Sequence, residues 1–319
     1  MTAEPMQKTT DEQPLRHELR NRYIFTGKLE MTTGLHIGGG KFTLSHTDSP
    51  VVLTPEGLPF IPGSSLKGVL RSTIEKFVAS LPEDLGLRSC GLPTEKDDSS
   101  EKDASAKKDD NDTSERCPTA HQKRIARERR EARTPKEAQA ILDKAREDLC
   151  HTCQLFGSPF AAGRIRINDL DLSEDTWSGA TQIRDGVAID RDKETARPGA
   201  KYDFEVVPST TEFSMYILVE NATPQDKQLL SIGLSEFVSG FAGIGGLRSR
   251  GLGACILKKL EIRAMELAEL KDVDERKQRL LRYLLRKKDG TEDGLDSIDT
   301  QHFLNQHITA LFGETPTNS

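Results

Sequence analysis

The segment between residues 95 and 116 cannot contribute to a packed core. Its sequence, EKDDSSEKDASAKKDDNDTSER, contains no aromatic residue and almost no aliphatic one. Such a segment cannot bury enough apolar surface to offset the entropy that ordering it would cost. We therefore expect a disordered loop inside an insertion, while the 319-residue chain is long enough for one large domain with insertions or two modest domains.

Four cysteines bracket this loop. Cys90 and Cys117 flank it, and Cys150 and Cys153 follow as a C-x-x-C pair in LCHTCQLFG. This spacing lets two thiolates bind one tetrahedral zinc ion. A closed site of four thiolates would tie the ends of the insertion together and replace a missing hydrophobic core, so we predict a structural zinc.

The sequence leaves two alternatives to this metal site open. His121 or His151 can substitute for one thiolate, because imidazole nitrogen is also a common zinc ligand. Alternatively, the cysteines are free thiols or a redox pair in a flexible region. Cys255, in the apolar segment GLGACIL, is expected in the core instead.

Charge is unevenly distributed along the chain. The formal net charge is −6, but residues 91–116 hold nine acids and five bases, and the first fourteen residues carry a further −2. The remainder is therefore close to neutral, so the net charge does not exclude a nucleic-acid partner. No apolar run is long enough to cross a bilayer, and the polar, acidic amino terminus does not resemble a signal peptide. We expect a cytoplasmic protein without membrane contact.

Alternating and helical patterns predict the core. Residues 23–31 alternate apolar and polar side chains, as half-buried strands do, and residues 213–220 (FSMYILVE) give the strongest strand signal in the chain. A helix is expected to begin after Pro62, with Ser64 or Ser65 as its cap. Its apolar residues Leu66, Leu70, Ile74, Phe77 and Val78 recur at helical spacing. Residues 49–60 are expected to form a second extended segment, broken by Pro50, Pro55 and Pro59. Further strands are expected at residues 164–172, 200–207 and 254–262, and helices at 119–149 with a break at Pro135, 224–241, 265–285 and 302–312.

The order strand, helix, strand occurs twice and predicts an α+β protein with a ferredoxin-like or RNA-recognition-type core. The segment around residues 178–200 is expected to project from this core as a β-hairpin thumb. The predicted parts are a disordered amino terminus (1–20), a core built from residues 21–84 and 155–263, an insertion (85–154) with the disordered loop and the zinc site, and a helical carboxyl-terminal extension (264–319).

Two glycine-rich segments, GLHIGGG at residues 34–40 and GIGGLRSRGLG at 243–253, favour contact with phosphate. Glycine lets backbone amides approach an anion without a side chain in the way. The second segment adds Arg248 and Arg250, whose guanidinium groups can bind phosphate oxygens. Neither segment fits a dinucleotide-binding or Walker motif, so the pattern indicates a groove for a flexible anionic polymer.

The stretch from residue 119 to 149 carries nine bases against four acids between His121 and Arg146. It is either a surface that faces RNA or a solvated basic face.

Six sequence blocks, in this order, resemble the RAMP superfamily, in particular the backbone subunit of type III CRISPR effector complexes. They are GLHIGGG, TDSPVV, GLPFIPGSSLKGVLRSTIE, CHTCQLFGSPF, RDGVAIDRDKETARPGAKYDFEVVP and GIGGLRSRGLG, and they lie between residue 23 and about residue 262. The resemblance implies an RNA-recognition-type core, a filament of copies along guide RNA, a structural zinc and metal-dependent cutting of target RNA. The charged insertion and the tail after Arg263 depart from the family pattern and leave the subtype open.

The resemblance places the catalytic aspartate of the family at Asp48, in SHTDSPVV. A carboxylate on a loop can bind a divalent cation such as Mg²⁺, or can act as the base when the 2'-hydroxyl of RNA attacks its own phosphate. The alternative is an aspartate that only shapes a turn before Ser49 and Pro50.

The resemblance also implies RNA contacts in three regions: the glycine loops, the start of the first helix, and the thumb, whose apolar side chains would intrude between guide and target bases. The alternatives are a capped surface helix with solvated bases and an ordinary hairpin. The implied RNA-binding residues are His36, Gly38, Gly39, Ser64, Ser65, Lys67, Arg71, Arg184, Val187, Ile189, Arg191, Gly245, Gly246, Arg248 and Arg250.

By this resemblance the protein binds guide (CRISPR) RNA and single-stranded target RNA, and cuts the target as an endoribonuclease. Its implied partners are further backbone subunits, the large polymerase-like subunit, the subunit that caps the guide 5' end and the small subunit. Two other functions stay open, a scaffold subunit that binds RNA without cutting it, and an independent zinc protein with another partner.

Overall fold

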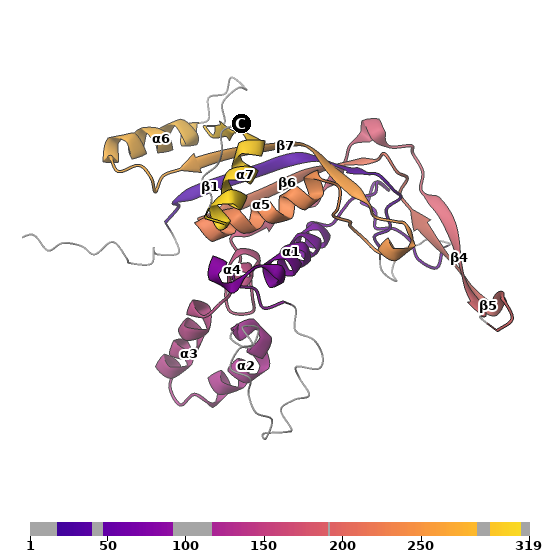
Figure 1. Ribbon diagram of the computed structural model, residues 1–319, viewed down its shortest axis with the longest axis horizontal. Helices are drawn as coiled ribbons and strands as arrows, with labels where there is room; N and C mark the ends of the chain where they lie inside the picture. The colour runs from indigo at the N-terminus through magenta and orange to yellow at the C-terminus, as the bar shows by residue number, and fades with distance from the viewer. Residues whose placement is uncertain (1–17, 40–46, 92–116, 191, 286–293, 314–319) are drawn as a thin grey trace, which may run out of the picture.

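The computed structural model describes residues 18–39, 47–91, 117–190, 192–285 and 294–313, and Figure 1 shows how their elements are arranged. The predicted disordered loop at residues 95–116 lies outside these ranges, as does most of the predicted disordered amino terminus. Among the described helices, none is both long and apolar enough to span a membrane.

The centre of the protein is an antiparallel sheet in the order β2-β6-β1-β7-β8, with β3 also paired to β6. Tyr23 and Phe25 of β1 are buried against the helices, as the alternating pattern predicts. The strands are β1 (Asn21–Met31), β2 (Ile165–Ile167), β3 (Asp171–Leu172), β6 (Glu212–Glu220), β7 (Cys255–Glu266) and β8 (Asp296–Ile298).

Three helices pack against the sheet and share one hydrophobic core with it (Figure 1). Phe303 lies in the helix Thr300–Leu311, and its ring centre is 5.9 Å from that of Tyr23 and 5.8 Å from that of Phe25. The extension after residue 263 therefore contributes to the main core rather than forming a separate unit. The helices are α1 (Gly63–Ser80), α5 (Pro224–Val238) and α7 (Thr300–Leu311).

The start of α1 differs from the sequence prediction. The N-cap is Pro62, and neither Ser64 nor Ser65 caps the helix with its side chain. Instead the Gly63 N–H donates a hydrogen bond of 2.7 Å to the Asp169 carboxylate, which comes from the segment beside β2. On the apolar face of α1, Leu66, Leu70, Ile74 and Val78 are buried as predicted, whereas Phe77 is 40% exposed because it lies to one side of that face.

The insertion is mainly helical, with the predicted break before Pro135, where the Thr134 side chain caps the next helix. Its first two helices each bury a single side chain, Ile125 in one and Ala145 in the other. They lie away from the sheet, beyond α1 (Figure 1). The helices are α2 (Gln122–Glu131), α3 (Pro135–Glu147) and α4 (His151–Phe156), preceded by a 3-10 helix at Pro118–His121.

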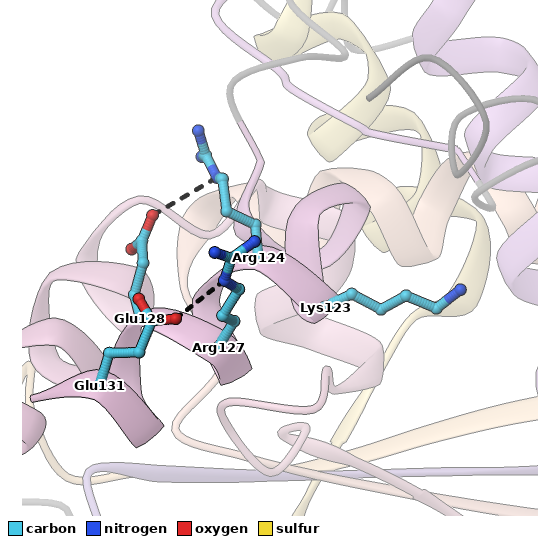
Figure 2. Close-up of a pocket in the computed structure, with 5 residues that line it drawn as sticks. All are labelled: Lys123, Arg124, Arg127, Glu128 and Glu131. Atoms are coloured by element: carbon cyan, nitrogen blue, oxygen red, sulfur yellow. Dashed lines mark hydrogen bonds and ion pairs between the residues drawn. The ribbon is translucent and has the colours of Figure 1, made fainter. Parts of the chain in front are cut away.

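The exposed face of α2 carries ion pairs within the helix. Arg124 pairs with Glu128 and Arg127 with Glu131, each one helical turn apart, and these side chains line a surface hollow together with Lys123 (Figure 2). Several bases of this stretch are therefore neutralised by local acids, as expected of a solvated helix face.

The hairpin predicted near residues 178–200 is present and longer than expected. β4 (Gln182–Asp190) and β5 (Thr195–Val206) form a two-stranded antiparallel ribbon that extends from one end of the sheet (Figure 1).

Residues 49–60 form isolated bridges rather than a continuous strand, as the predicted breaks at Pro50, Pro55 and Pro59 imply, because proline offers no N–H for a ladder. One predicted element is wrong in its extent. The predicted helix at residues 265–285 begins only at Val273, as α6 (Val273–Leu285). β7 continues to Glu266 because its residues pair with β1.

A pair of glycines in α1 tests how closely this helix approaches the segment after β2. A Cβ at Gly63 would lie 2.5 Å from the Ile167 carbonyl oxygen, so alanine must push the segment away and is expected to destabilise the protein by about 1–3 kcal/mol. Gly68 is exposed on the same helix, and a Cβ added there would meet no atom within 4 Å, so Gly68→Ala is expected to stabilise by about 0.5–1 kcal/mol. Urea denaturation of both variants measures the difference, and equal effects would contradict the close approach.

Candidate functional site

The two glycine-rich loops lie against each other. The Gly246 N–H donates to the His36 carbonyl oxygen and the Gly253 N–H to the Gly34 carbonyl oxygen, both at 2.8 Å. At Gly245, φ is +87° and an added Cβ would lie 2.5 Å from the His36 oxygen, so only glycine fits. Segments from opposite parts of the chain therefore form one backbone surface.

Gly38 and Gly39 connect this surface to the loop that contains Asp48. Gly38 forms a bridge with Val51, and the Gly39 N–H donates to the Pro50 carbonyl oxygen at 2.9 Å. Hydrogen bonds thus connect the segment that precedes residues 40–46 to the segment that follows them.

His36 is buried beneath the loops and is not open to an approaching ligand. Its Nδ1 lies 2.8 Å from the Glu205 carbonyl oxygen, and its Nε2 lies 3.4 Å from the Ser49 hydroxyl. The edge of its ring also packs near Phe204, with 5.8 Å between the ring centres. In this position His36 supports the segment that follows Asp48.

Asp48 is exposed, and its loop lies along strand β5. The Asp48 N–H donates to Asp203 Oδ1 at 2.6 Å, and the Asp203 N–H donates to Asp48 Oδ2 at 3.2 Å. The next residue, Ser49, forms a parallel bridge with Phe204. The base of the hairpin thus fixes the loop.

Arg248 and Arg250 lie exposed in a short 3-10 helix, Arg248–Arg250, of the second glycine loop. Arg248 donates to the Gly243 carbonyl oxygen at 3.3 Å, within its own loop. Arg250 donates to the Tyr202 hydroxyl on β5. One end of the protein therefore brings together Asp48, both glycine loops, two arginines and the hairpin base.

Of the predicted thumb residues, the structure describes the side chains of Arg184 and Val187, both exposed on β4. Val187 is 49% exposed. The Ile189 side chain and all of Arg191 lie outside the described part of the chain.

At the start of α1, Ser64 is exposed while Ser65 and Lys67 are half-buried. Burial lowers the pKa of Lys67, and the nearby charge of Arg71 lowers it further.

Arg71 is bound within the protein. Its guanidinium group forms an ion pair of 2.7 Å with Glu75 and donates to the Gly157 carbonyl oxygen at 3.2 Å. It also lies 3.4 Å from the Cys153 sulfur. The geometry gives Arg71 a structural role between α1 and the insertion, and its predicted RNA contact stays a prediction.

The four predicted cysteines gather in one cluster, with all four sulfur atoms within 4.8 Å of one another. Cys153 Sγ lies 3.5 Å from Cys90 Sγ and 3.9 Å from Cys117 Sγ. Four thiolates around one tetrahedral ion are separated by about 3.8 Å when each metal–sulfur bond is about 2.3 Å. The cluster therefore fits a metal ion, and Cys255 is buried in the main core as predicted.

Neighbouring residues also contact the cysteine cluster. Thr119 Oγ1 lies 3.2 Å from the Cys153 sulfur. The His151 Nδ1 accepts a hydrogen bond from the Arg88 N–H at 3.0 Å, so this nitrogen is already engaged.

Sequence reasoning missed Asp203, Glu205 and Tyr202 as neighbours of the Asp48 loop. All three lie in the segment KYDFEVVP, to which the family resemblance assigns no role residue by residue. The strand pattern of this segment gives no indication that the distant Asp48 loop pairs with it.

Two comparisons with known proteins, one against family models and one against curated proteins, agree with each other. The model of the RAMP superfamily matches residues 28–256. A protein of Enterococcus italicus named CRISPR system Cms endoribonuclease Csm3 is 51% identical over 59 residues, which cover 18% of this chain and 28% of that protein. A protein of the same name from Methanocaldococcus jannaschii is 44% identical over 68 residues, covering 21% and 27%. The chain thus matches about a quarter of the length of these curated relatives.

The cysteine cluster predicts that the purified protein carries one tightly bound metal ion. Cys153→Ser should abolish the bound metal and lower the thermal stability of the insertion, because Cys153 is fully buried at the centre of the cluster. Cys255→Ala, a change at the one cysteine outside the cluster, should keep the full metal content. Elemental analysis by mass spectrometry measures both, and unchanged metal in Cys153→Ser would rule the site out.

Proposed function

Because the chain belongs to the RAMP superfamily, we propose that it is the repeating backbone subunit of a type III CRISPR effector complex. In this role it binds guide RNA and cuts the paired target RNA at Asp48. One observation carries the proposal: Asp48, the two glycine loops, Arg248 and the base of the hairpin meet at one end of the protein. The names of the relatives support both the complex and the endoribonuclease activity.

The core is proposed to be ferredoxin-like, of the RNA-recognition type. Along the chain, β1, α1, β2, β6, α5 and β7 follow the order strand, helix, strand, strand, helix, strand. The four strands lie in the order β2-β6-β1-β7, and each pair of neighbours is antiparallel. Both features support the assignment.

The guide RNA would bind across the glycine loops and the start of α1. Backbone amides near Gly38 and Gly245 can approach phosphates closely, and Arg248 adds positive charge. The hairpin would contact the guide and target duplex through Val187 and its neighbours, reading shape rather than sequence. The proposed contact residues are those predicted above, His36 and Arg71 acting through the loops and helix that they support.

In the proposed cleavage, the ribose 2'-oxygen attacks the adjacent phosphorus and forms a cyclic phosphate as the bond to the leaving 5'-oxygen breaks. Asp48 is exposed, and its carboxylate can accept the proton of the 2'-hydroxyl or position that hydroxyl group near the phosphate. The carboxylate oxygens of Asp48 are also suitable ligands for Mg²⁺, which when bound would stabilise the developing negative charge.

The metal in the cysteine cluster is proposed to be a structural zinc. Four sulfur ligands close the coordination sphere, which leaves no position for a substrate. The remaining partners are proposed from the family: further backbone copies, the large polymerase-like subunit, the subunit that caps the guide 5' end and the small subunit. Such a complex would act in the cytoplasm, where it meets target transcripts.

A second candidate function is a scaffold subunit that binds RNA without cutting it. The reciprocal hydrogen bonds between Asp48 and Asp203 favour it, because they show that Asp48 also shapes its own loop.

Replacement of the two loop arginines tests RNA binding. Arg248→Ala with Arg250→Ala should weaken binding of a single-stranded RNA at least about tenfold and reduce the slope of log affinity against log salt by roughly 1.4, the release expected for two phosphate contacts. The matched control is Arg124→Ala with Arg127→Ala, which removes two arginines already paired with glutamates on α2. If the control weakens binding as much as the loop variant, RNA lies on the insertion instead.

Replacement of Asp48 separates the two candidate functions. In the reconstituted complex, Asp48→Ala should slow cleavage of a target RNA about 10²- to 10⁴-fold, the contribution of a positioned acid or base. Guide and target binding should stay within about twofold of the original, because no predicted phosphate contact is removed. Cleavage at the original rate would disprove the catalytic role of Asp48, and RNA from the purified complex should contain repeat-derived guides in either case.

A further inference from the structure

Three successive residues at the base of the hairpin hold the Asp48 loop. Asp203 exchanges hydrogen bonds with Asp48, and Phe204 forms a bridge with Ser49. The Glu205 N–H donates to the Ser49 carbonyl oxygen at 3.0 Å. The Glu205 carboxylate accepts from the Thr47 hydroxyl at 3.3 Å and from the Val51 N–H at 3.1 Å.

The Asp203 side chain has the most direct contact with Asp48. Its Oδ1 accepts the Asp48 N–H at 2.6 Å, which fixes the backbone from which the Asp48 side chain projects. In return the Asp203 N–H binds Asp48 Oδ2 at 3.2 Å, which fixes one carboxylate oxygen. Within the described part of the chain no hydrogen bond is made by Asp48 Oδ1.

The strand that provides these contacts is itself well supported. Phe204 and Val206 are buried in a small cluster with Leu252 of the second glycine loop. Across the ribbon, Asp203 pairs in register with Asp185 of β4. His36 contacts the Glu205 carbonyl oxygen from below. The base of the hairpin is therefore a fixed support for the Asp48 loop.

We propose that Asp203 is a positioning residue for the cleavage reaction, which sets the orientation of the Asp48 carboxylate from the base of the hairpin. The proposal rests on the proposed function of Asp48 and extends it. Asp203 acts through its acceptor oxygen and its backbone N–H, not through its charge or by contact with RNA. Because the same strand continues into the hairpin, the element proposed to contact the duplex also holds the catalytic carboxylate.

The test compares two changes at Asp203 in the reconstituted complex with guide RNA. Asp203→Ala removes the acceptor for the Asp48 N–H and should lower the single-turnover cleavage rate about 10- to 100-fold, the range for a misplaced catalytic group. Asp203→Asn keeps an oxygen acceptor at the same place and should retain the rate within about threefold. Target affinity should be unchanged in both variants.

Asp185→Ala is the matched control, because Asp185 lies directly across the ribbon and pairs with Lys201 rather than with Asp48. It should cleave at the original rate, and thermal unfolding of all three variants shows whether the hairpin is intact. An original rate in Asp203→Ala overturns the proposal. An equal loss in Asp203→Asn and Asp203→Ala also overturns it, since the charge of Asp203 would then be required. Failure of Asp48→Ala to slow cleavage would instead disprove the catalytic role of Asp48, whatever the Asp203 variants do.

Discussion

β1 is hydrogen-bonded along both edges, to β6 on one side and to β7 on the other, and the location of the candidate site follows from this pairing. Met31, the last residue of β1, lies opposite Cys255, the first residue of β7. The loop that leaves β1 and the loop that enters β7 must therefore start side by side. Their glycines then allow the backbones to touch, as the contact between Gly253 and Gly34 shows. The close approach of the two glycine loops thus follows from the topology of the sheet.

The insertion is stabilised in a different way from the sheet. Its helices α2 and α3 bury one side chain each, far too little apolar surface to fold alone. The cysteine cluster with Leu149 provides the missing centre, and Arg71 connects it to α1. Four thiolates around a divalent ion leave a net negative charge, so a guanidinium group 3.4 Å from one sulfur offsets part of it.

The sequence predicted those features whose signal lies within one segment. The alternation of β1, the strand composition of β6, the apolar face of α1, the break before Pro135 and the cysteine spacing are local patterns, and the structure agrees with each. The failures at the start of α1 and at the end of β7 involve a distant partner. Asp169 replaces the predicted serine caps of α1 from 106 residues away, and pairing with β1 keeps Met265 in a strand. Likewise, no pattern in KYDFEVVP shows that Asp203 meets a loop 155 residues earlier.

A counter-charge distinguishes the two bases near the start of α1 that are proposed to contact RNA. Arg71 and Lys67 were predicted together, but only Arg71 has a counter-charge, the nearly buried Glu75. A phosphate could recruit Arg71 only by leaving that carboxylate unpaired, which is costly in a buried position. Lys67 makes no ion pair within the described residues, and burial and Arg71 both lower its pKa. A phosphate beside Lys67 would supply the missing negative charge and favour the protonated amine, so the proposed contact at this helix depends on Lys67 and not on Arg71.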